Sequence, residues 1–179
     1  HDGQVGLFCV GDGETYNVPV EMAETRYGIR VDEHSLHTDG AGAGEYRGGS
    51  GAVRVYRSMN ENQTFTASFG RNKWPVWGAA GGKDGSVNYF QFIDADGTVS
   101  EPMGIAARRV MNTNDVVRMV TATGGGYGNP FKRPAEKVAM DVKNEYITVE
   151  QAKADYGVLV DPETFKVLGL TEERQKAEK

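Results

Sequence analysis

The sequence predicts an α+β fold in which a β-rich sheet or sandwich, residues 1–133, is followed by two or three short helices that pack on it, residues 134–179. Most of the 24 glycines lie before residue 124, among many aromatic and β-branched residues and without a long stretch of helical period. From Pro134 onwards, apolar residues recur with the period of a helix. Because 179 residues suffice for one hydrophobic core, we expect a single β-rich region with a helical tail.

Two strands and one hairpin turn are readable from local patterns. The run QTFTASF, residues 63–69, alternates aromatic and polar side chains, and VNYFQFI, residues 87–93, is rich in strand formers. The next residues, DADG at 94–97, contain an Asp-Gly dipeptide typical of a hairpin, with the return strand starting at Thr98. The D-x-D-G pattern lacks the third oxygen ligand and the final glutamate of an EF-hand calcium loop, so we predict a turn.

The helical tail begins at Pro134, which fits the first position of a helix, and Val138 and Val142 follow one turn apart. Thr148 and Gln151 match a capping box, which predicts the start of a second helix. After it we expect a short strand, a turn and a terminal helix. The residues concerned are Val149, Ala152, Tyr156 and Gly157 for the second helix, Val158–Val160 for the strand, Asp161 and Pro162 for the turn, and Thr171 for the cap of the terminal helix.

Composition and charge exclude several classes of protein. The apolar fraction of 39% and the charged fraction of 25% are those of a globular chain, not of a disordered or fibrous one. The net charge of −5 comes with scattered basic residues, which leaves no footprint for nucleic acid. No apolar run approaches the roughly 20 residues that cross a bilayer, and the lone Cys9 excludes an internal disulfide, so we expect a cytoplasmic protein without a membrane partner. Because the first ten residues show neither an initiating methionine nor a signal-peptide pattern, we expect the chain to be cut from a longer protein.

The run TGGGYGN, residues 123–129, follows a β-branched stretch and raises the question of a phosphate-binding loop. A P-loop needs a second glycine, a lysine and a hydroxyl at fixed offsets, and neither this run nor GAAGGKD at residues 78–84 has the complete set. The dinucleotide pattern also fails, because Asn129 stands three residues after Gly126. We therefore predict a tight β-to-α corner in which glycines permit positive φ or close backbone packing.

A second candidate is the stretch EHSLHTD, residues 33–39, where His34, His37 and Asp39 could together bind a divalent ion. On a strand, however, His34 and His37 point to opposite faces. We therefore predict solvated side chains at a strand-to-loop junction and no metal in this chain. No serine or cysteine stands beside a convincing base, and Cys9 lies in an apolar run typical of a buried, inert thiol, so no catalytic residue is identified.

Five stretches, taken in order, resemble the hydantoinase B/oxoprolinase family. Residues 123–161, TGGGYGNPFKRPAEKVAMDVKNEYITVEQAKADYGVLVD, resemble its C-terminal signature, in which a glycine run, Y-G-[DN]-P and a basic residue lead into a helix with a D-V pair and then a helix ending in Y-G-V. The others are YNVPVEMAE at 16–24, DGAGAGEYRGGSG at 39–51, RNKWPVWGAAGGKDG at 71–85 and NDV at 114–116. The resemblance runs from about residue 14 to residue 161.

Departures from the family pattern are also informative. The family commonly has aromatic and basic side chains where this chain has His34 and His37, which favours solvated histidines over a metal site. Asn114 stands in place of a usual glycine and Val76 in place of a usual second proline, which concerns local turns. Family members are several times longer, and in related enzymes the ligands of the divalent metal lie in an N-terminal part that this chain lacks.

The resemblance implies a component of an ATP-dependent hydantoinase or oxoprolinase that hydrolyses a cyclic amide of the hydantoin or 5-oxoproline class. Enzymes of this group use ATP to phosphorylate a cyclic amide or an enolate-type oxygen before hydrolysis or carboxylation. Two alternatives stay open: a subunit of an ATP-dependent ketone carboxylase of the acetone or acetophenone type, and a non-catalytic assembly module that docks on the hydantoinase A partner.

The resemblance also implies where the cofactors and partners belong. ATP and a divalent metal would be bound by other parts of the assembly, namely a hydantoinase A-type ATP-binding subunit and the missing N-terminal part of hydantoinase B. Within this chain, we expect the loops around two stretches to lie nearest to a substrate or anion. The residues predicted there are Arg71, Lys73, Gly124, Gly125, Gly126 and Tyr127.

Overall fold

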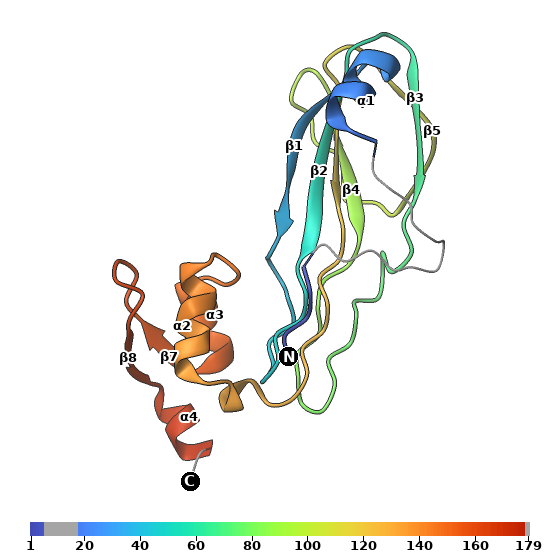
Figure 1. The fold of residues 1–179 in the computed structure, drawn as a ribbon. Coiled ribbons are helices and arrows are strands. Elements are labelled where there is room, and N and C mark those ends of the chain that lie inside the picture. Colours follow the sequence, from blue (N-terminus) through green and yellow to red (C-terminus); the bar gives the residue numbers. More distant parts are fainter. Residues whose placement is uncertain (6–17, 178–179) are drawn as a thin grey trace.

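The computed structural model describes residues 1–5 and 18–177, and Figure 1 shows an elongated sheet region, long irregular loops below it and a small helical region beside those loops. The elements, in chain order, are α1 (Val20–Tyr27), β1 (Ile29–His37), β2 (Gly51–Ser58), β3 (Gln63–Ser68), β4 (Tyr89–Ile93), β5 (Ile105–Met111), β6 (Val116–Val120), the 3-10 turn η2 (Pro130–Lys132), α2 (Ala135–Lys143), α3 (Val149–Tyr156), β7 (Val158–Val160), β8 (Val167–Leu170) and α4 (Glu172–Ala177). The predicted α+β class, with antiparallel strands first and short helices last, is confirmed. None of the helices in this described part is long and apolar enough to cross a membrane.

The sheet region is built from antiparallel pairs. One sheet has four strands in the order β1-β2-β6-β4, and β3 pairs with β5 in a second sheet of two strands. Phenylalanines join the two sheets, because the ring of Phe65 on β3 meets Phe90 and Phe92 on β4 at centroid distances of 5.5 and 5.4 Å, edge to face. The other face of the four-stranded sheet buries a smaller valine cluster, made of Val53, Val55, Val116 and Val120.

The strand predictions from local patterns are confirmed for β3 and β4, and the turn between 94 and 97 forms as expected. The Thr98 carbonyl accepts a hydrogen bond from the Asp94 N–H at 2.9 Å, and Gly97 has φ of 88°. The helix α1 was not foreseen, because residues 1–133 were expected to hold no helix. Its sequence, VEMAETRY, buries only Ala23 and therefore carries almost no apolar stripe.

The helical tail matches its predicted elements closely. Thr148 and Gln151 form the complete capping box of α3, and Gly157 ends that helix with φ of 64°. Pro134 is the N-cap of α2 and not its first helical residue, because its ψ of 132° is still extended.

The packing of the tail differs from the prediction that the helices lie on the sheet. Helices α2 and α3 pack chiefly on the hairpin of β7 and β8, around Val138, Ala152 and Val158, which are all fully buried. Among the described residues before η2, Ala43 alone belongs to this apolar cluster. Strand β8, which no sequence pattern predicted, explains this difference. With β7 it forms an apolar face within the tail, and α2 and α3 pack on that face.

Candidate functional site

Three irregular segments lie between the sheet and the helices, and their backbones form what we call the glycine layer: residues 40–51, 76–86 and 121–128. Their main chains are hydrogen-bonded to one another. The Gly42 N–H donates to the Gly124 carbonyl at 2.9 Å, and the Lys83 N–H donates to the Ala43 carbonyl at 2.7 Å. Many backbone groups of the layer are thus satisfied by hydrogen bonds between irregular segments.

Glycine is required here because the three backbones nearly touch. A Cβ on Gly125 would lie 2.2 Å from the Trp77 carbonyl oxygen, and one on Gly126 would lie 2.2 Å from the Ala43 carbonyl oxygen. Such distances leave no room for any side chain. Gly128 has φ of 77°, so the prediction of a glycine corner with at least one positive φ is confirmed.

The hydrogen bonds of the corner also argue against a phosphate loop. In a phosphate loop, successive N–H groups converge on the anion. Here the N–H groups of Gly124, Gly126 and Gly128 donate to the carbonyls of Gly49, Lys83 and Ala79, at 2.8, 2.9 and 2.9 Å. The Tyr127 N–H donates to the Tyr46 carbonyl at 3.0 Å. These four N–H groups are therefore already used inside the layer.

Three aromatic side chains, Tyr46, Trp77 and Tyr127, stand on the glycine layer, and we call them the aromatic strip. Tyr127 pairs with Tyr46 on one side and with Ala79 on the other, and the two tyrosine rings are 6.3 Å apart. Trp77 lies in the same segment as Ala79, through which that segment meets Tyr127. The exposed fractions are 37% for Tyr46, 69% for Trp77 and 57% for Tyr127.

The structure brings Arg71 to this strip although 53 residues of sequence or more separate it from the glycine run. Its guanidinium carbon lies 5.3 Å from the centre of the Trp77 ring, and the Trp77 carbonyl faces Gly125. Arg71 also has φ of 49°, which is unusual for a residue with a side chain. Lys73 follows in the same exposed loop. The predicted residues Arg71 and Gly124–Tyr127 thus belong to one neighbourhood.

The two histidines of β1 lie apart, as their odd spacing requires. They pair across the ladder with Arg54 and Gly51 respectively, without a register shift between them, so they point to opposite faces. The His37 Nδ1 atom lies 2.9 Å from the Thr121 carbonyl oxygen. Within residues 1–5 and 18–177, no three side chains of the His, Cys, Asp or Glu type gather as a metal site. Cys9 lies outside the described residues.

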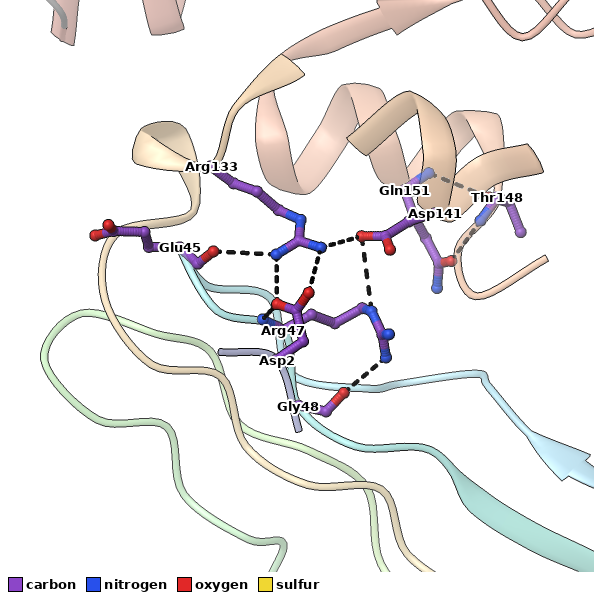
Figure 2. Close-up of polar contacts among 8 residues, drawn as sticks. All are labelled: Asp2, Glu45, Arg47, Gly48, Arg133, Asp141, Thr148 and Gln151. Atoms are coloured by element: carbon purple, nitrogen blue, oxygen red, sulfur yellow. Dashed lines mark hydrogen bonds and ion pairs between the residues drawn. The ribbon is translucent and has the colours of Figure 1, made fainter. Parts of the chain in front are cut away.

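Sequence reasoning missed a charge cluster made of Asp2, Arg47, Arg133 and Asp141 (Figure 2). Arg133 donates to both carboxylate oxygens of Asp2, at 2.5 and 3.0 Å, and its Nη2 lies 2.7 Å from Asp141 Oδ2. Arg47 Nε lies 3.6 Å from the same Asp141 oxygen. Both arginines are almost fully buried, with 4% exposed for Arg47 and 1% for Arg133. The cluster joins residues 1–5, the glycine layer and α2.

Burial controls the titration of this cluster. Partial burial alone would raise the pKa of Asp2, but hydrogen bonds from Arg133 and from the Arg47 N–H, with the charges of both, bring that pKa below its ordinary value. Burial raises the pKa of Asp141 above its ordinary value, an effect that Arg133 and Arg47 offset only in part. Burial likewise raises the pKa of Tyr156 to about 12. Arg133 keeps its ion pairs with Asp2 and Asp141 at neutral pH, because a guanidinium stays charged there.

The signal that could have found the cluster was in the motifs themselves. Arg47 stands in the stretch YRGGSG, Arg133 is the basic residue after Y-G-N-P, and Asp141 belongs to the D-V pair. Charged residues within motifs that otherwise consist of glycines and apolar residues are candidates for burial in pairs.

Comparison with known proteins adds an independent finding. The family model described as Hydantoinase B/oxoprolinase matches residues 1–130. The B component of a putative D-/L-hydantoinase from a Pseudomonas species is 32% identical over 148 residues, which are 82% of this chain and 25% of that protein. The chain therefore spans about a quarter of the length of the curated relatives that it matches.

Two solved structures share the fold. The ATP-dependent caprolactamase from Pseudomonas jessenii matches with a TM-score of 0.69 and 29% identity, over 89% of this chain and 27% of that chain. Nucleotide-free acetone carboxylase matches with a TM-score of 0.76 over 98% of this chain and 27% of its own, at 17% identity. At that identity the second match concerns the fold alone.

Proposed function

The chain belongs to the hydantoinase B/oxoprolinase family, and on that basis we propose that it forms part of the hydantoinase B component of an ATP-dependent enzyme that hydrolyses a cyclic amide. The substrate would be of the hydantoin or 5-oxoproline class. The observation that carries this proposal is the similarity to a protein named as the B component of a hydantoinase, at 32% identity over 82% of this chain.

The role of this part of the component is to position other groups. The described residues hold no cluster of His, Cys, Asp or Glu suited to a metal, and the buried charges of Arg47, Arg133 and Asp141 are paired within the charge cluster. ATP and a divalent ion would then be held elsewhere, by a hydantoinase A-type subunit and by the remaining part of hydantoinase B. A rigid layer that aligns neighbouring parts supports catalysis by holding the reacting groups in position.

Within this chain, the neighbourhood of the substrate or its anionic groups is the exposed side of the glycine layer. Arg71 and Lys73 supply positive charge, and the exposed ring of Tyr127 directly follows Gly124–Gly126 in the chain. Because the N–H groups of Gly124, Gly126 and Tyr127 are used within the layer, contact with a ligand would come from side chains. A guanidinium can bind a carboxylate or phosphate through two parallel hydrogen bonds.

Two other functions have a specific observation in their favour. A ketone carboxylase stays the second candidate, because acetone carboxylase shares this fold over 98% of the chain and the fold by itself does not distinguish carboxylation from ring hydrolysis. The lack of a catalytic set among the described residues favours the third, an assembly module that contributes no reacting group.

The test is to combine residues 1–179 with a hydantoinase A-type subunit and with the remaining region of a hydantoinase B protein, and to supply ATP and Mg²⁺. We expect ATP-dependent opening of hydantoin or 5-oxoproline, measured as the N-carbamoyl amino acid or the glutamate that forms, together with released phosphate. Residues 1–179 alone should show no turnover. Carboxylation of acetone in place of ring opening would replace the first candidate by the second, and turnover by the isolated chain would contradict the positioning role.

A further inference from the structure

The aromatic strip has the composition and the rigidity of a binding surface. Tryptophan, tyrosine and arginine are the residue types that dominate binding energy at protein interfaces, and Tyr46, Trp77, Tyr127 and Arg71 are these types. The glycine layer beneath them is fixed by hydrogen bonds between its three segments. A surface that is already ordered loses little conformational entropy when a partner binds.

The charges at the rim of the strip indicate the chemistry of the partner. Among the described residues, Arg71 and Lys73 have no carboxylate partner, whereas Lys83 of the same loop is paired with Asp155 at 2.5 Å. These two cations stand at the rim of the strip on a chain whose net charge is −5. Such a rim fits a surface that carries carboxylates around apolar groups.

A second copy of this chain fits the strip less well than a different surface does. In a symmetric dimer each strip would face its own copy, which would bring the rims with Arg71 and Lys73 together. Like charges at close range disfavour that contact. The curated relatives, by contrast, carry about three quarters of their length beyond the part that this chain matches. That length is ample for a surface covering the strip.

We propose that the aromatic strip, with Arg71 and Lys73 at its rim, docks a carboxylate-bearing protein surface from the part of hydantoinase B that lies outside this chain. This inference rests on the proposed function, since it takes the partner from the same protein. It assigns the exposed rings to an interface between parts of hydantoinase B, at whose margin the substrate neighbourhood proposed above would lie, and leaves the charge cluster to hold the fold.

The two tryptophans of the chain allow a direct test, because both lie in the loop that carries the strip, with 79% of Trp74 and 69% of Trp77 exposed. The chain is labelled with 5-fluorotryptophan, and a Trp74→Phe variant assigns the fluorine signal of Trp77. The probe is the subunit of the Pseudomonas jessenii caprolactamase that is similar to this chain, its beta component, from which the matched region has been removed. A second arm uses a chimera in which residues 1–179 replace that region in the complete beta component.

A fluorine exposed to solvent has different chemical shifts in H₂O and D₂O. We expect this difference to disappear for Trp77 on mixing and in the chimera. The affinity measured on mixing should fall as the salt concentration rises. Trp77→Ala, and separately the pair Arg71→Glu and Lys73→Glu, should weaken binding at least tenfold. Leu168→Ala, which changes an apolar side chain that is 67% exposed on β8, should leave the affinity unchanged.

Two results would overturn the proposal. One is a Trp77 signal that stays solvent-exposed in both arms. The other is a Trp77 signal that changes with the concentration of the chain alone, in step with self-association in the ultracentrifuge, because the occupant would then be a second copy. Both arms are measured without ATP or substrate. Docking without ring opening would therefore contradict the proposed function alone, and ring opening by a chimera whose Trp77 signal stays solvent-exposed would contradict this inference alone.

Discussion

The glycine layer and the charge cluster lie next to each other, yet they are built in opposite ways. The layer is held by main-chain hydrogen bonds, and its large side chains, Trp77 and Tyr127, are turned to solvent. The cluster is held by side chains, and Arg47 and Arg133 are buried. In the layer, changing a side chain removes a contact surface, whereas adding one disrupts the fold. In the cluster, removing a side chain leaves a buried charge without its partner.

The largest effect should come from Arg133→Ala, which leaves Asp141 buried beside Arg47 alone. We expect a loss of about 3–5 kcal/mol in the free energy of unfolding, measured by urea denaturation. Arg133→Lys should lose less, because it keeps the charge without the planar fork. The neighbouring Lys132→Ala, on an exposed side chain, should change little. Equal stability of all three variants would show that the cluster does not hold the fold.

The next effect should come from Gly126→Ala, whose new Cβ would lie 2.2 Å from the Ala43 carbonyl oxygen. We expect a loss of about 3 kcal/mol, because backbone must move to make room. The control is Gly70→Ala, where nothing lies within 4 Å of the added Cβ. Equal melting temperatures for the two variants would contradict the claim that the layer is closely packed at Gly126.

A smaller effect should come from Asp2→Asn, and it should depend on pH. The pKa of Asp2 is lower in the folded chain than in the unfolded chain, so the unfolded chain takes up the proton first and acid destabilises the fold. The stability difference between wild type and Asp2→Asn, about 1 kcal/mol, should be complete above the ordinary pKa of about 4. It should disappear as the pH falls through the lowered pKa.

Taking that difference also removes most of the contribution of Asp141, because burial, and only last the charge of Asp2, raises its pKa. The raised pKa of Asp141 changes stability with pH in the opposite direction, because the folded chain takes up the proton before the unfolded chain does. Asp141 is present in both wild type and Asp2→Asn. Denaturation curves at several pH values between about 2 and 7 measure the difference. A gap that grows on acidification would contradict the assigned direction.

The smallest effect on stability should come from Trp77→Ala, within about 0.5 kcal/mol, because the ring is mostly exposed. Phe90→Ala, at a ring with 0% exposed in the sheet core, should cost about 3–5 kcal/mol in the same assay. A large loss for Trp77→Ala would mean that the aromatic strip stabilises the isolated chain and is not kept for an interface.

Local patterns were sufficient for the elements that carry them. The capping box of Thr148 and Gln151, the alternation in β3 and the Asp-Gly turn before β5 are all decided by neighbours in sequence. Helix α1 was missed because only Ala23 is buried, and β8 because its partner β7 lies across a turn that gives no register. The place of the helical tail depended on that hairpin and could not be read locally.

The candidate site divides in the same manner. The glycine corner was predicted, because each glycine indicates positive φ or close backbone packing at its own position. The cluster was not, since Asp2 and Arg133 are 131 residues apart and no spacing rule relates them. The convergence of Arg71 with the glycine run came from the family motifs, and the structure supplies its physical contact through Trp77.

The central claim is that the glycine run is a structural corner beneath a contact surface and does not bind phosphate. The measurement that tests it most directly is Gly128→Ala in the assembled enzyme, followed by both the melting temperature and the Michaelis constant for ATP. Because Gly128 has φ of 77°, we predict a lower melting temperature, from strain of about 1 kcal/mol or more, and an unchanged Michaelis constant. An unchanged melting temperature with a large rise in the Michaelis constant for ATP would contradict the claim and make the run a phosphate loop.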